Sequence, residues 1–395
     1  MDRKTVYFDN NATTQVAPEV VEAMRPFFCE LYGNPSSMHF FGGQVGAYVA
    51  KAREEVAAFL NCEPDEVYFT SCATESDNTA IRGAADWHGT SMKMVTTAVE
   101  HPAVLQPARR LKALGHEVVE LPVDSGGQID LDRLRAELKG TKNALVSVMW
   151  ANNETGVVFP IREVAEIAKE HGATVHTDAV QVAGKIPIDL KKTPVDMLSI
   201  SGHKFHAPKG VGVFFLRRGT KIKPFMLGGH QEGGRRAGTE NVPYIVGLAK
   251  ACALASAHMA DEARALAPLR DKLEAGILAA CPNVRVNGDR AHRLPNTLNV
   301  SFEYIEGEAI AYHLSDLGIC ISTGSACASG SLDPSHVIRA MGVPFTAVHG
   351  SVRFSLSRYN TMEEVDYVLE QLPPVIANLR ALSPFGPDRD PTTFR

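Results

Sequence analysis

The chain lacks the features that mark secreted, membrane-spanning or nucleic-acid-binding proteins. Its N-terminus, M-D-R-K-T-V-Y-F-D-N, has no apolar signal core. No run of about 18 apolar residues is present, so we expect no transmembrane helix. The formal net charge is −5 at pH 7, which gives no general attraction to nucleic acid or to an anionic membrane. We therefore expect a cytoplasmic protein that binds neither.

The cysteines are not spaced as a set of disulfides or a structural metal site would require. There are seven, an odd number, and no C-x-x-C pair occurs among them. This spacing argues against a set of disulfides and against a structural zinc site, and it fits a reducing cytosol. Nucleotide-binding motifs are lacking too, because Gly184-Lys185 is followed by isoleucine and no G-x-G-x-x-G opens a helix after the first strand.

What the chain does contain is an alternation of short apolar runs with amphipathic stretches. Apolar runs predict strands over residues 67–70, 144–150, 173–177, 195–201 and 211–216. Helical spacing predicts helices over residues 75–87 and 161–171. Strands and helices in this order are typical of an α/β fold with a largely parallel sheet. From about Asp261 a charged helical stretch, 262–278, precedes further strands at 295–302 and 351–356, which indicates a smaller α+β domain.

Three polar residues follow successive predicted strands. Asn153, Asp178 and Lys204 each lie at or just beyond the carboxyl end of a strand, where open α/β sheets bind their ligands. Pyridoxal phosphate needs such a lysine for its Schiff base and such a carboxylate to keep its ring nitrogen protonated. Gln181 could donate to the ring hydroxyl. Taken singly, a surface lysine, a capping aspartate and a turn asparagine are the commoner interpretations, and only the combination favours the cofactor.

The cofactor phosphate requires hydrogen-bond donors, and two places offer them. Thr74 and the backbone amides of Ala73 and Thr74 lie where a strand runs into a helix start, although Thr74 could simply cap that helix. Ser201 and His203 flank Lys204 and could add donors. His101 could stack on the pyridine ring and shuttle protons, but a lone histidine is more often structural.

Two further residues suggest how a substrate is handled. Arg353 alternates with Val352 and Phe354 along a predicted strand, so it is either on a solvated face or grips a substrate carboxylate. Cys327 lies in a loop of small residues, S-T-G-S-A-C-A-S-G-S, which we expect to be flexible and exposed. Exposure suits a nucleophilic thiolate, although an adventitious free thiol is the ordinary alternative.

Six short motifs together resemble the cysteine desulfurase family, in the family's order and over nearly the whole chain. They are D-N-N-A-T-T (9–14), G-N-P-S-S-M-H (33–39), C-A-T-E-S-D-N (72–78), S-G-H-K (201–204), R-R-A-G-T-E-N (235–241) and G-S-A-C-A-S-G-S (324–331). The runs at 205–213, 302–310 and 353–359 resemble the nitrogen-fixation (NifS-like) type most closely. The family's loop usually has serine and threonine where Thr323 and Ala328 stand here, which could alter loop mobility but keeps the cysteine.

The resemblance implies a fold-type I, aspartate-aminotransferase-like homodimer that uses pyridoxal 5′-phosphate. It implies a large cofactor-binding domain over 15–260 and a small domain made of 1–14 plus 261–395. Catalytic roles fall to Lys204 as the Schiff-base lysine, Cys327 as the persulfide-forming nucleophile and His101 as the stacking histidine. The implied cofactor-binding residues are Ala73, Thr74, His101, Asn153, Asp178, Gln181, Ser201, Gly202, His203, Lys204 and Thr239, with Thr239 reaching the other subunit's phosphate. The implied substrate-binding residues are Arg353, Asn153 and Asn34.

The implied reaction takes sulfur from free L-cysteine, leaves a persulfide on Cys327 and releases L-alanine. An iron–sulfur scaffold protein is the expected acceptor, by resemblance that of nitrogenase maturation. No permanent metal site is expected, although Cys327 could transiently ligate a nascent iron–sulfur cluster. A selenocysteine lyase or an aminotransferase of the same fold is the nearest alternative, and a non-catalytic sulfur carrier or regulatory partner that retains the fold is another.

Overall fold

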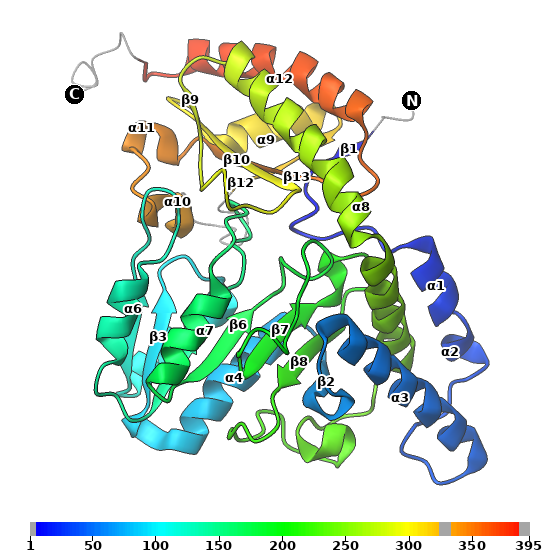
Figure 1. The fold of residues 1–395 in the computed structure, drawn as a ribbon. Coiled ribbons are helices and arrows are strands. Elements are labelled where there is room, and N and C mark those ends of the chain that lie inside the picture. The colour runs from blue at the N-terminus through cyan, green and yellow to red at the C-terminus, as the bar shows by residue number, and fades with distance from the viewer. Residues whose placement is uncertain (1–4, 324–332, 387–395) are drawn as a thin grey trace.

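The structure is a computed structural model that describes residues 5–323 and 333–386. Cys327 and its loop lie outside the described residues. The described chain forms a large sheet with helices on both faces, below a smaller sheet that is covered by the C-terminal helix (Figure 1).

The large sheet has seven strands. Their spatial order is β2 (Val67–Thr70), β8 (Gly212–Leu216), β7 (Met197–Ser201), β6 (Thr174–Asp178), β5 (Ala144–Ser147), β3 (Lys93–Thr97) and β4 (Glu117–Leu121). The pairings from β7 to β4 are parallel, whereas β8 is antiparallel to both β2 and β7. The predicted strand at 211–216 therefore exists, but it is not one of the parallel strands. The short connection after β7 is the reason, because a parallel return needs a crossover of a dozen or more residues.

Successive residues on each strand face opposite layers. Met94 and Leu145 pack with helices α4 (Ala73–His88) and α5 (Pro102–Ala113), whereas Val95 and Val146 pack with the layer on the other face. That second layer contains α3 (Phe40–Leu60), α7 (Ile161–Glu170) and the first half of α8 (Val242–Ala280). The predicted helix at 161–171 is confirmed, and its apolar stripe is buried.

The smaller sheet is antiparallel, in the order β12 (Ser322–Thr323), β13 (Ser351–Ser355), β10 (Thr297–Phe302) and β9 (Val284–Val286). Strand β1 (Val6–Tyr7) pairs in parallel with β11 (Ile319–Cys320), which ties the N-terminus to this part of the fold. Helices α9 (Gly307–Asp316) and α12 (Met362–Leu382) and the second half of α8 complete its core. The remaining helices are α1 (Pro18–Met24), α2 (Pro26–Cys29), α6 (Leu131–Leu138), α10 (His336–Ala340) and α11 (Phe345–Val348).

Helix α8 joins the two cores. The predicted helix at 262–278 is its second half, and the helix continues back to Val242 without a break. Leu248 and Ala255 pack in the large core, whereas Leu273 and Ile277 pack in the small one. By length and composition α8 could also cross a membrane, a test that a buried core helix passes equally well. In this fold it packs against α1, α3 and α12.

Candidate active site

The structure brings the ends of three parallel strands together at one edge of the large sheet. Asp178 is the last residue of β6, Lys204 lies in a short 3₁₀ turn (Gly202–Lys204) directly after β7, and Asn153 follows the end of β5. Burial raises the pKa of Asp178 to about 6, while the Val180 amide and the charge of Lys204 act in the opposite direction. An amine and a carboxylate of the predicted kinds therefore share one electrostatic environment.

The lysine is held by the N-terminal segment 9–14. Lys204 Nζ donates to the carbonyl oxygen of Asn11 at 2.7 Å and to that of Ala12 at 2.8 Å. Gln181 Nε2 donates to the same Asn11 oxygen at 3.1 Å. Thr14 donates from its backbone nitrogen and its hydroxyl to the carbonyl oxygen of His203. The residues of D-N-N-A-T-T do not indicate this role, because the contacts run through backbone carbonyls that residue type does not reveal.

Helix α4 begins at the place where the phosphate site is predicted. It begins at Ala73, two residues earlier than predicted, with Cys72 as its N-cap after strand β2. Ala73 is buried and Thr74 is exposed. Thr74 and His101 line one hollow of about 660 Å³, together with Arg82. The N-cap residue Cys72 makes no side-chain hydrogen bond to the first turn, and a helix N-terminus of this kind suits a phosphate group.

His101 is a neutral histidine with a defined tautomer. It caps α5, and its Nδ1 accepts a hydrogen bond from the Ala103 backbone nitrogen at 3.1 Å. Burial, followed by the charges of Lys204 and His336, lowers its pKa to about 4. The ring is therefore uncharged near pH 7 and carries its proton on Nε2.

The residues around Lys204 are tightly packed. Ser201 and Gly202 are buried, and a Cβ at Gly202 would lie 3.0 Å from Ala207 Cβ. His203 Nδ1 lies 3.1 Å from the Thr13 hydroxyl, and burial together with nearby lysines, Lys204 first, lowers its pKa to about 4. Close packing on this side fixes the direction from which the lysine side chain leaves the backbone.

Arg353 is buried, so the interpretation as a solvated strand face is wrong. Its Nη1 donates to the Asn153 carbonyl oxygen at 2.9 Å, and its Nη2 pairs with Asp9 Oδ1 at 2.7 Å. Its Nε is buried without a hydrogen-bond partner among the described residues. Strand β13 of the small sheet thus directs a guanidinium with unused hydrogen-bonding capacity towards the loop after β5 of the large sheet.

Asn34 and Thr239 are not brought to Lys204 within this single chain. Asn34 lies in the loop between α2 and α3, is exposed, and accepts a hydrogen bond from the Ser36 backbone nitrogen. Thr239 is exposed and lines a separate hollow of about 130 Å³ beside Ser71 and Arg236. The predicted roles of both residues, and that of Cys327, remain predictions.

Two buried acids near Asp178 were missed from the sequence. Asp77 of α4 is fully buried, lies 3.5 Å from His176 Nε2, and has a pKa raised by burial and by the charge of Asp178. Burial raises the pKa of Glu100 to about 8, although its Oε1 accepts bonds from Thr97 and Met149. Asp77 lies on the same buried face of α4 as Ala73 and Ala80. An acidic residue at that position in the helical pattern could have indicated a buried carboxylate.

The residues present fit pyridoxal phosphate. They provide an amine, a carboxylate with a neighbour that favours its ionised form, a helix start for the phosphate and a neutral imidazole at the same hollow. Within residues 5–323 and 333–386 there is no cluster of three or more His, Cys, Asp or Glu side chains suited to a metal ion.

Comparison with known proteins agrees with this arrangement. The aminotransferase class-V family matches residues 6–368. A cysteine desulfurase from a Nostoc strain is 56% identical over 383 residues, 97% of this chain and 96% of that protein. The cysteine desulfurase NifS of Azotobacter vinelandii is 56% identical over 391 residues, 98% of this chain and 97% of that protein. A solved structure described as a NifS-like protein has a TM-score of 0.90 at 42% identity, covering 95% of this chain and 100% of that one.

These matches confirm the resemblance drawn from the motifs and the predicted fold-type I architecture. The chain belongs to the pyridoxal-phosphate-dependent class V aminotransferases, and within them to the cysteine desulfurase family.

Proposed function

We propose that this chain is a cysteine desulfurase that converts L-cysteine to L-alanine and holds the sulfur as a persulfide on Cys327. The observation that carries the proposal is the convergence of Lys204, Asp178 and Arg353 from the two sheets onto one site. In this reaction the carbon–sulfur bond of cysteine breaks, a sulfur–sulfur bond forms on Cys327, and a proton takes the place of the sulfur on carbon. The sulfur then passes to an iron–sulfur scaffold protein, in the proposed case that of nitrogenase maturation.

Residues of this chain would hold the cofactor at both ends. Lys204 would attach it covalently, Asp178 would pair with its ring nitrogen, and Gln181 would donate to its ring hydroxyl. Its phosphate would lie against a donor set from several elements, namely Ala73, Thr74, Ser201, Gly202, His203 and, from the partner subunit, the position of Thr239. When bound, pyridoxal phosphate withdraws electrons from the amino-bearing carbon of the substrate and so acidifies its proton.

The remaining steps fall to side chains. Arg353 would grip the substrate carboxylate with Nε and an Nη, because a guanidinium binds carboxylate through two parallel hydrogen bonds. Asn153 and Asn34 would complete the substrate site. The freed amine of Lys204 would move the proton from the α-carbon, and the Nε2 proton of His101 is available for the leaving product. Cys327 would attack the substrate sulfur as a thiolate.

We also propose a homodimer. The segment 28–40 carries Asn34 among large apolar side chains that are open to solvent, with Met38 fully exposed and Phe40 81% exposed. Tyr32 and Phe28 extend the same apolar segment. A second copy of the chain would cover this segment and would explain why Asn34 and Thr239 lie away from Lys204 in a single chain.

The domain division and the location in the cell belong to the same proposal. The pairing of β1 with β11 and the bridge between Asp9 and Ser355 support assigning residues 1–14 to the small domain with 261–395, and 15–260 to the large one. Helices α10 and α11 pack on the large core all the same, so the two units share an interface. We propose that the protein works in the cytoplasm, where reduced thiols persist.

The proposal is tested by measuring alanine and sulfide released from L-cysteine in the presence of a thiol reductant. The wild-type chain is expected to form the two in equal amounts, and Cys327→Ala to form neither. Cys29→Ala is the matched control, because Cys29 is an exposed free cysteine with no assigned role, and it should keep full activity. Sulfide release that persists unchanged in Cys327→Ala would reject the assigned nucleophile.

A further inference from the structure

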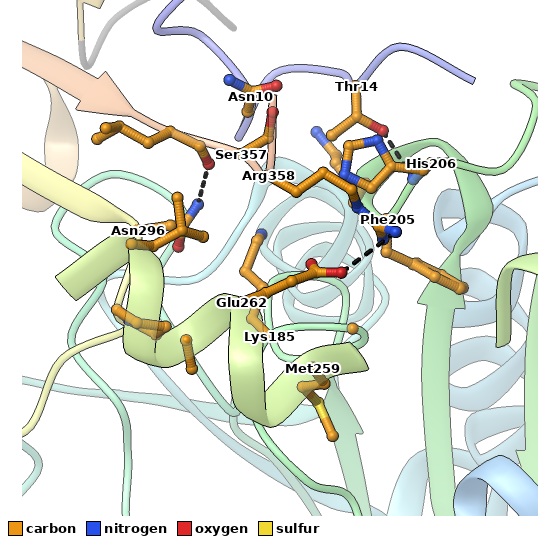
Figure 2. A pocket seen from close by; sticks show the side chains of 16 residues that line it. Asn10, Thr14, Lys185, Phe205, His206, Met259, Glu262, Asn296, Ser357 and Arg358 are labelled. Carbon is orange, nitrogen blue, oxygen red and sulfur yellow. Dashed lines mark hydrogen bonds and ion pairs between the residues drawn. The ribbon is translucent and has the colours of Figure 1, made fainter. Parts of the chain in front are cut away.

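Lys185 has no role in the proposed reaction, although it lies beside the residues to which that reaction is assigned. Its side chain lines a small pocket of about 30 Å³ between the two sheets, shown in Figure 2 with Glu262 and Arg358. Glu262 is already paired with Arg358 at 3.2 Å. No ion pair within the described ranges involves Lys185. A half-buried lysine without an acidic partner carries a free-energy cost, so its contacts call for an explanation.

The contact that Lys185 does make leads directly to the lysine of the site. Lys185 Nζ donates to Gln181 Oε1 at 2.7 Å, and Gln181 Nε2 donates to the Asn11 carbonyl oxygen at 3.1 Å. That same oxygen accepts the hydrogen bond from Lys204 Nζ at 2.7 Å. Lys185 and Lys204 are therefore joined by a chain of three hydrogen bonds through one carboxamide and one carbonyl.

The backbone holds Lys185 in this position. The preceding Gly184 has a φ of +74°, and a Cβ there would lie 2.6 Å from the Cβ of Phe205. Gly184 thus lets the turn approach the residue directly after Lys204. Burial and the charges of Lys204 and Arg353 hold the pKa of Lys185 well below its usual range, which places all three groups in one electrostatic neighbourhood.

The Asn11 carbonyl oxygen can only accept, so the Gln181 group that faces it must be the amide nitrogen, and the carboxamide oxygen then accepts from Lys185. The amide nitrogen then faces Asn11, with one of its two hydrogens on that carbonyl and the other still available. If the carboxamide turned over, its oxygen would oppose the Asn11 oxygen and could donate to nothing. We propose that Lys185 is a positioning residue that fixes Gln181 in the one orientation that donates both to Asn11 and to the ring hydroxyl of the cofactor.

This inference rests on the proposed function, and its test separates the two. Cofactor-free chain is titrated with pyridoxal phosphate at one pH, and both the dissociation constant and the visible absorption band of the complex are recorded. Lys185→Met is expected to weaken binding about tenfold, because Gln181 Oε1 loses its donor, and to shift the band. Lys192→Met, in the exposed stretch that follows, should stay within about twofold of wild type, a change expected of a surface ion pair.

A double-mutant cycle with Gln181→Ala decides the mechanism. If Lys185 acts through Gln181, the double variant binds the cofactor no worse than Gln181→Ala alone. Losses that simply add, or a Lys185→Met complex with wild-type affinity and band, overturn the inference. Lys185→Leu takes its place in the cycle if Lys185→Met does not fold. A wild-type chain that fails to bind pyridoxal phosphate rejects the proposed function instead.

Discussion

The ion pair of Asp9 and Arg353 leads to a prediction about both the free energy of unfolding and the binding of substrate. Asp9 occupies one edge of the guanidinium that we assign to the substrate carboxylate, at 2.7 Å. Asp9→Asn removes the charge at nearly constant shape. In the substrate-free variant the guanidinium therefore has no anionic partner. The side of the guanidinium that we assign to the substrate carboxylate is unchanged.

The size of the effect follows from the burial of the two groups. Breaking a fully buried ion pair costs about 3–5 kcal/mol because it leaves an uncompensated charge. Arg353 is 6% exposed and Asp9 21% exposed, and asparagine still offers an oxygen to Nη2. We therefore expect Asp9→Asn to lower the free energy of unfolding by about 2 kcal/mol. If a bound carboxylate restores about half of that, the KM for L-cysteine falls about fivefold.

The assay combines urea unfolding of the cofactor-loaded protein, with and without L-alanine, and steady-state kinetics with L-cysteine. L-Alanine should stabilise the variant more than the wild type, because binding to the folded state adds free energy that depends on affinity. Asp65→Asn is the matched control: its partner Arg218 is 70% exposed, so the change should cost less than about 1 kcal/mol. A variant whose stability matches that control, or whose KM rises, refutes the reasoning.

Three other perturbations test separate parts of the site. Lys204→Ala is expected to lose all turnover and all covalent cofactor, which borohydride reduction followed by mass spectrometry detects. The folded chain keeps a proton on Glu100 up to about pH 8, whereas the unfolded chain releases it near 4.5. Stability therefore falls as pH rises between these values, by up to about 1.4 kcal/mol per pH unit, and Glu100→Gln should flatten that slope in urea titrations of cofactor-free chain. Phe40→Asp should convert the dimer to monomers in light scattering, because it places a charge in the exposed apolar segment.

Each of these perturbations has a result that would contradict it, and Phe40→Asp also has a matched control. Tyr312→Asp changes an aromatic residue that is 74% exposed but lies away from that segment, and it should leave the dimer intact. A dimeric Phe40→Asp protein would place the subunit contact elsewhere. Identical pH slopes for wild type and Glu100→Gln would mean that Glu100 does not bind the extra proton. Turnover retained by Lys204→Ala would end its assignment as the catalytic amine.

The parts of the site that were predictable are those that depend on local pattern. Asp178 and Lys204 follow short apolar runs, and the carboxyl ends of parallel strands meet at one sheet edge, so their proximity could be expected. Helix α8 shows where pattern fails. Its first half is apolar on most sides because it is buried in the large core, so only the charged second half showed the amphipathic spacing of a helix.

Contacts between residues far apart in the sequence could not be predicted, for a different reason. Nothing in the residue type of Asp9 indicates that it meets Arg353, since their approach depends on how β13 is placed against the N-terminal segment. The antiparallel direction of β8 likewise depends on a connection that has no room for a crossover helix. Asn34 and Thr239 lie away from Lys204 in the single chain, and their approach to the cofactor belongs to the proposed homodimer.

The N-terminal segment 9–14 connects these observations physically. Asp9 is bonded to the guanidinium from the small sheet, Asn11 accepts from Lys204 and Gln181, and Thr14 donates to the carbonyl of His203. A shift of β13 when Arg353 binds a carboxylate would therefore pull on the carbonyls that hold the amine of Lys204. The six residues of this segment thus link the guanidinium assigned to the substrate with the amine of Lys204 through hydrogen bonds, although none of their side chains is assigned a catalytic role.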